Sequence, residues 1–183
     1  MESYGKNELE KVLLKIDEEA SLVLGDHAPR CRVVVVGGSA MLLADLTARP
    51  TTHDVDVLEA DRRLREILSN YNMVNSAVMA YADQIPYNYE DRLVSLELDT
   101  KIVDYFVPCP EDLAVMKLYA MRPNDVADLE SEAFLAAIDW QRMDELVLGP
   151  DEAAGSALVR RRYEEMADAY RSWAKDHGHE ANA

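Results

Sequence analysis

Residues 33–43, VVVVGGSAMLL, decide the fold of this chain. The run of valines predicts a buried strand from Arg32 to Val36, because β-branched side chains favour extended backbone. Two glycines then turn the chain, and Ser39 occupies the N-cap position of a predicted short helix that ends at about Thr47. A strand, a glycine turn and a helix in this order form the usual layout of a nucleotide-binding turn.

The next segment, TTHDVDVL at residues 51–58, carries two aspartates with a spacing of two. Its alternation predicts a strand over residues 54–58, on which Asp54 and Asp56 point to one face about 6–7 Å apart. Paired carboxylates repel each other unless a cation lies between them, so this pair indicates a divalent metal, with Mg²⁺ or Mn²⁺ favoured over zinc. The alternative is two solvated residues on the wet face of an edge strand.

The rest of the chain supplies helices and one further pair of strands. Alternating runs at residues 92–98 and 101–107, separated by Asp99-Thr100, predict a β-hairpin. Residues 70–90 are expected to be irregular, with room for a short helix around 75–82. Apolar residues at helical spacing predict helices over residues 7–24, from 61, and near 111–121, 124–137, 139–147 and 151–175.

This order predicts an α/β (α+β) fold with a small mixed sheet flanked by helices. We expect residues 1–108 to form the α/β core with its N-terminal helix, and residues 109–183 to form a helical region packed on the same domain. A length of 183 residues suits one ordinary domain.

The amino-acid composition limits which partners this protein can bind. The 19 Lys+Arg against 35 Asp+Glu give a net charge of −16, which disfavours a long nucleic acid and suits a small nucleotide with its own metal, or a basic protein. No apolar run approaches the ~20 residues that span a bilayer, and the N-terminus lacks signal-peptide order, so we expect a cytoplasmic protein without membrane contact. Cys31 and Cys109 are expected to be free thiols.

A Rossmann-type dinucleotide site is one interpretation of the glycine turn. Asp56 and Glu59 follow the turn by about 20 residues, where an acidic side chain would bind a ribose hydroxyl. However, Gly37 and Gly38 are adjacent, whereas that fingerprint needs three glycines at fixed offsets, and no Lys-Ser/Thr follows as in a P-loop.

Two motifs together resemble a different family. The first comprises Gly37, Gly38 and Ser39, then Thr52, Asp54 and Asp56, and is similar to the signature of the DNA polymerase β-like nucleotidyltransferase superfamily. The second, PEDLAVMKLYAMRPNDVADL at residues 110–129, resembles the P-E-D-L-x-x-x-K-L-x-A-x-R-x-K-D-x-x-D-L stretch of its minimal branch of uncharacterised and AbiEii-toxin-like nucleotidyltransferases. Together they span about residues 33 to 130.

The resemblance implies chemistry on a nucleoside triphosphate. The turn and its serine would hold the triphosphate, while Asp54 and Asp56 would bind Mg²⁺ (or Mn²⁺). A third carboxylate from a neighbouring strand would complete the metal site or act as a base; Asp104 is the best candidate, and Glu97 and Asp99 are weaker ones. The alternative for Asp104 is a solvated strand residue.

The resemblance assigns further residues to the site. The implied catalytic residues are Asp54, Asp56, Asp104 and Lys117. The implied nucleotide-binding residues are Gly37, Gly38, Ser39, Thr52, Lys117, Arg122 and Asp125.

The expected function is Mg²⁺-dependent transfer of a nucleoside monophosphate to an RNA end, a protein or a small molecule, in the manner of a toxin of a toxin–antitoxin system. One alternative is a catalytically degenerate relative that acts through an antitoxin-like protein partner. The Rossmann-type binder is the second alternative.

Overall fold

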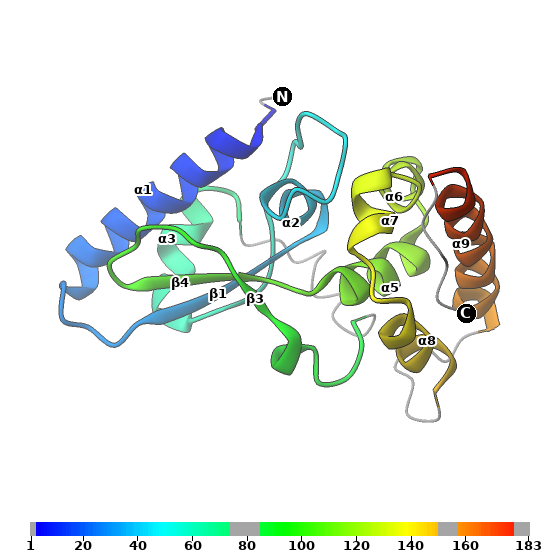
Figure 1. The fold of residues 1–183 in the computed structure, drawn as a ribbon. Coiled ribbons are helices and arrows are strands. Elements are labelled where there is room, and N and C mark those ends of the chain that lie inside the picture. The colour runs from blue at the N-terminus through cyan, green and yellow to red at the C-terminus, as the bar shows by residue number, and fades with distance from the viewer. Residues whose placement is uncertain (1–2, 74–84, 150–156, 178–183) are drawn as a thin grey trace. The chain divides into compact units, whose positions relative to one another are not determined.

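The computed structural model describes residues 3–73, 85–149 and 157–177 (Figure 1). The described chain divides into two compact units. Unit 1 contains residues 3–45, 49–73 and 88–109, and unit 2 contains residues 46–48, 85–87, 110–149 and 157–177.

A mixed four-stranded sheet, with strand order β2-β1-β4-β3, forms the centre of unit 1. The central strand β1 (Cys31–Val36) pairs in parallel with β4 (Val103–Val107) and antiparallel with β2 (Asp56–Ala60). On its other side, β4 pairs antiparallel with the short β3 (Val94–Ser95). The predicted α/β class with a small mixed sheet is confirmed.

Helix α1 (Lys6–Leu24) covers one face of this sheet. Its buried residues Leu9, Leu13, Ile16 and Ala20 recur every three or four positions, as its sequence period predicts. The Tyr105 hydroxyl of β4 donates to the Leu13 carbonyl at 2.8 Å, which ties the helix to the sheet. Helix α3 (Arg65–Asn70) contacts α1, and the short 3-10 helices Arg62–Leu64 and Tyr89–Arg92 complete the unit.

The glycine turn differs from its predicted form. Helix α2 spans Gly37–Leu43, so both glycines lie within it and it ends before Thr47. The predicted N-cap role of Ser39 is wrong, since Val36 holds that position and the Ser39 hydroxyl donates to its carbonyl at 2.9 Å. The left-handed φ of Gly37, +67°, lets the helix begin directly after Val36, the last residue of β1.

Two predicted strand boundaries are also corrected. Strand β2 begins at Asp56, so Asp54 precedes it and the same-face argument for the two aspartates does not hold. The hairpin pairing of β3 with β4 is confirmed, but the two-residue turn Asp99-Thr100 is wrong because residues 96–102 lie between the strands. The Asp17 carboxylate and the Arg30 guanidinium bind the backbone near residue 101, which holds this segment outside a regular ladder.

Unit 2 is helical. Its predicted helix 124–137 is broken, because Ser131 caps a new helix by accepting a hydrogen bond from the Phe134 amide. Phe134 and Met143 lie in the core of unit 2. The rings of Trp140 and Tyr170 stack, with their centroids 4.1 Å apart. The helices are α5 (Pro110–Ala120), α6 (Pro123–Leu129), α7 (Glu132–Ala137), α8 (Trp140–Leu148) and α9 (Ala157–Asp176).

Some predictions lie outside the described residues, namely the short helix around 75–82 and the start of the helix at 151–175. Within the part that the structure describes, no helix combines the length and apolar character needed to cross a membrane.

Candidate functional site

The glycine turn lies directly against the second aspartate. Strand β1 ends at Val36, whose partner across the ladder is Asp56. A Cβ placed on Gly37 would lie only 2.6 Å from Asp56 Oδ2, and its φ of +67° lies in the left-handed region that favours glycine. The fold therefore brings the Asp56 carboxylate into contact with the backbone that joins β1 to α2.

A second contact group surrounds Gly38. A Cβ at this position would lie 3.0 Å from Thr52 Oγ1 and 3.1 Å from Arg49 Nη2. Thr52 is buried, and its backbone is held by a two-way pairing with Tyr4, at 2.7 and 2.9 Å. Gly37, Gly38, Thr52 and Asp56 thus meet, as the first motif predicts.

Sequence reasoning missed Arg49. Its guanidinium lies beside Gly38, where it adds a positive charge to the turn. The available signal was that Arg49 is the only lysine or arginine between Ser39 and Asp54 in a strongly acidic chain. Planar guanidinium groups bind phosphate oxygens in a forked geometry, so this position suits a phosphate contact.

Asp54 and Asp56 fit a magnesium ion by their chemistry. Asp54 is exposed on the segment before β2, and its carbonyl oxygen lies 3.4 Å from Thr52 Oγ1. Among residues 3–73, 85–149 and 157–177, no three His, Cys, Asp or Glu side chains form a group that could hold a metal. Two carboxylates are nevertheless a typical protein share of a Mg²⁺ site, because waters and substrate phosphates supply the other oxygens.

Ser39 is enclosed rather than open. Its side chain is fully buried, and its hydroxyl hydrogen is directed to the Val36 carbonyl. This bond fixes the first turn of α2 on the end of β1, so the observed contacts of Ser39 stabilise the turn.

Asp104 does not join this group. It lies opposite Arg32 in the β1–β4 ladder, whereas Asp56 lies opposite Val36. Four strand residues at about 3.3 Å each separate those two positions by roughly 13 Å. The Asp104 carboxylate instead accepts a hydrogen bond from Arg30 Nε at 2.7 Å, which raises the pKa of the arginine. Glu97 and Asp99 lie in the loop between β3 and β4.

The second motif forms a buried charge cluster within unit 2. Lys117 is 4% exposed, and its ammonium donates to Asp125 Oδ1 at 3.1 Å and Asp128 Oδ2 at 2.6 Å. Arg122 Nε donates to Asp125 Oδ2 at 2.8 Å, while Thr47 donates to Asp128 at 2.6 Å. Burial acts to raise the pKa of Asp125, but the Arg122 and Lys117 contacts outweigh it and lower that pKa.

These contacts give Lys117, Asp125 and Asp128 a structural task in unit 2. Arg122 keeps 60% of its side chain exposed, so its charge remains accessible from solvent. The roles of Lys117, Arg122 and Asp125 at phosphates stay predictions.

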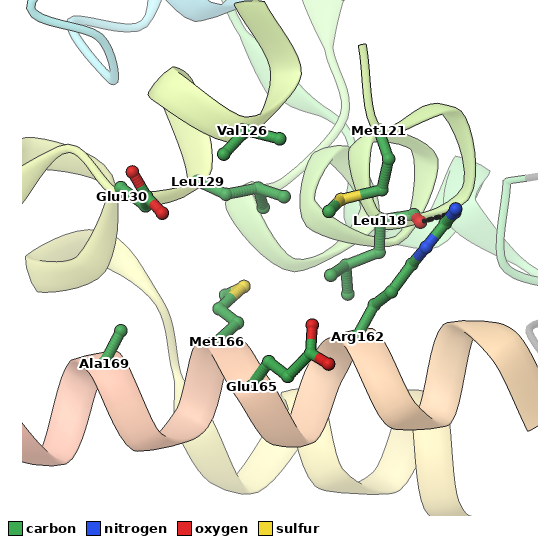
Figure 2. Close-up of a pocket in the computed structure, with 9 residues that line it drawn as sticks. All are labelled: Leu118, Met121, Val126, Leu129, Glu130, Arg162, Glu165, Met166 and Ala169. Carbon is green, nitrogen blue, oxygen red and sulfur yellow. Dashed lines mark hydrogen bonds between the residues drawn. The ribbon is translucent and has the colours of Figure 1, made fainter. Parts of the chain in front are cut away.

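Unit 2 also contains a small cavity between α5, α6 and α9 (Figure 2). Its volume is ≈ 100 Å³, and Leu118, Met121 and Met166 are among the apolar side chains that line it. Arg162 at its edge donates to the Leu118 carbonyl at 2.7 Å and so caps α5. This cavity is well below the 300–1,000 Å³ of ordinary ligand pockets and does not suit a nucleoside triphosphate.

A comparison with family models matches residues 11–177 to a family described as nucleotidyltransferase of unknown function (DUF6036). Comparisons with curated proteins and with solved structures gave no match.

Proposed function

The chain belongs to this family of nucleotidyltransferases, and from that premise we propose that it transfers a nucleoside monophosphate from a nucleoside triphosphate to an acceptor hydroxyl, with Mg²⁺. The contact between the Asp56 carboxylate and Gly37 carries the proposal. It supports the proposal because a carboxylate that could hold Mg²⁺ lies against the turn that would receive the phosphates.

The proposed site divides the work among a few residues. The absence of side chains at Gly37 and Gly38 lets Asp56, Thr52 and Arg49 come close to the turn. Arg49 binds phosphate oxygens beside Gly38, and Thr52 fixes the loop that carries Asp54. Asp54 and Asp56 would hold Mg²⁺, which would offset phosphate charge there.

The test is label transfer from an α-labelled nucleoside triphosphate with Mg²⁺, using each of the four bases. Asp54→Ala and Asp56→Ala should each lower transfer by at least roughly 100-fold, as expected for loss of a metal ligand. Asp176→Ala, an exposed aspartate at the end of α9, is the control and should retain wild-type transfer. Failure of the wild-type protein to bind any triphosphate with Mg²⁺ would contradict the proposal.

Arg49 offers a separate test of phosphate binding. Arg49→Met should raise the Kd for the Mg²⁺–triphosphate complex by about 10- to 100-fold, because a charge-assisted hydrogen bond contributes about 1.5–3 kcal/mol. Arg62→Met, an exposed arginine in the same unit, is the matched control. Calorimetry measures both, and equal affinities for the two variants would remove Arg49 from the site.

The net charge of −16 supports a basic protein as the partner of a toxin–antitoxin pair. We propose that such a partner binds independently of catalysis. Co-expression should yield a stoichiometric complex that survives the double change of Asp54 and Asp56 to Ala. A monomer that turns over without any partner would contradict this role.

A further inference from the structure

A β-bulge places one more carboxylate beside Asp56. In the β1–β2 ladder, Val35 pairs with Val57 but Val34 pairs with Glu59, so Leu58 is an extra residue in β2. Residues three apart on a regular strand would point to opposite faces. Because of the bulge, Asp56 and Glu59 share one face, opposite Val36 and Val34, about two strand steps or ~7 Å apart.

The Glu59 carboxylate is oriented by two neighbours. Arg32 Nη2 lies 2.6 Å from its Oε1, and the Tyr89 hydroxyl donates to its Oε2 at 3.1 Å. Burial, followed by the negative charge of Glu59, raises the pKa of Tyr89 to about 12, so that hydroxyl remains a donor at neutral pH. The Glu59 side chain is still 40% exposed, which leaves it accessible to a substrate.

We propose that Glu59 is the catalytic base that accepts the proton of the acceptor hydroxyl. This inference rests on the proposed nucleotidyl transfer and adds a residue to it. The acceptor oxygen forms a bond to the α-phosphorus, and its proton passes to Glu59. The bond from the α-phosphorus to the bridging oxygen of the β-phosphate breaks, and pyrophosphate leaves with that electron pair.

Glu59 is better placed than Asp104 to act as this base. Glu59 shares the Asp56 face at about two strand steps, whereas Asp104 is about four steps away. An acceptor oxygen bound between Glu59 and a phosphorus near Asp56 would be within reach of both. General base catalysis contributes about 10²–10⁴-fold to such a transfer.

The experiment uses water as the acceptor probe and measures pyrophosphate release from Mg²⁺–triphosphate by the full chain. Glu59→Gln should lower kcat about 100-fold, while KM and the calorimetric Kd for the triphosphate change by less than about threefold. Glu59→Asp should restore part of kcat, because it keeps the basic group but shortens its reach.

Glu90→Gln is the matched control, because Glu90 also faces Arg32, at 3.6 Å, but lies outside the bulge. It should retain wild-type kcat. Wild-type kcat in Glu59→Gln, or an equal loss in both variants, would overturn the proposal. So would a wild-type protein that binds triphosphate but releases no pyrophosphate. Absence of triphosphate binding in the wild type would instead show failure of the underlying function.

Discussion

Gly37 combines two demands that no other residue meets at once. Its φ is +67°, and a Cβ there would lie 2.6 Å from the Asp56 carboxylate. The first demand comes from the sharp passage from strand to helix, and the second from the site. Together they explain why a glycine stands at this position.

We predict that Gly37→Ala lowers stability by about 1–3 kcal/mol and weakens Mg²⁺–triphosphate binding, because the methyl group displaces Asp56. Gly25→Ala is the control: Gly25 has a φ of +90° but open space around its Cα. Urea unfolding should therefore show a lower free energy of unfolding for both variants. Calorimetry should show weaker triphosphate binding only for Gly37→Ala. Unchanged binding in Gly37→Ala would contradict the assigned contact.

At the scale of elements, a buried carboxylate of α1 joins the helix to β4, in addition to the hydrogen bond from Tyr105 to Leu13. Asp17 is 2% exposed and accepts the amides of Lys101, Ile102 and Val103 at 2.7–2.9 Å. These three hydrogen bonds to one side chain fix the backbone at the start of β4. They also hold this segment beside β1, the parallel partner of β4.

Asp17→Asn should cost about 2–4 kcal/mol of unfolding free energy, because the substitution removes the charge and one acceptor oxygen while the amides of Ile102 and Val103 stay buried. Chemical unfolding followed by circular dichroism measures this loss. The exposed neighbour Glu18→Gln should change stability by less than about 0.5 kcal/mol. Equal stability of both variants would mean that water satisfies the three amides.

At the scale of the whole molecule, the two units hold their charges differently. In unit 1 the ion pairs Arg30–Asp104 and Arg32–Glu59 are about 40% exposed, and such pairs contribute little. In unit 2, Lys117 lies in the interior between Asp125 and Asp128. Loss of one partner there would leave a buried charge without compensation.

Unit 2 should therefore lose stability in acid. The pKa of Asp125 is lowered on folding, so its contribution is complete above the unfolded value near ~3.9 and is lost as pH falls through the folded value. The two tryptophans of the chain, Trp140 and Trp173, both lie in unit 2, so their fluorescence reports its unfolding. Asp125→Asn should be less stable at neutral pH and show a flatter loss of stability below about pH 4.

Asp61 in unit 1, whose pKa is lowered to about 2 by Arg63, provides the comparison. Asp61→Asn should leave the acid response of the tryptophan signal unchanged if the units unfold separately. An Asp125→Asn protein with the wild-type acid response would contradict the role of the cluster.

Local sequence pattern predicted most of the helices and strands. The valine run and the amphipathic periods predicted β1 and α1, because burial and backbone preference act within a few residues. The first motif contains Gly37, Gly38, Thr52 and Asp56, which the fold brings together. Asp56 meets the turn because β1 pairs with β2, so that Val36, the residue before the turn, lies opposite Asp56.

Tertiary structure alone decided the remaining features. Strand register excluded Asp104 from the Asp56 group, and an extra residue in β2 turned Glu59 to the Asp56 face. Neither follows from the sequence, because the pairing of strands depends on long-range packing rather than on the period of one strand. The same reason applies to Arg49, whose place beside Gly38 follows from the path of the loop and not from its neighbours in the chain.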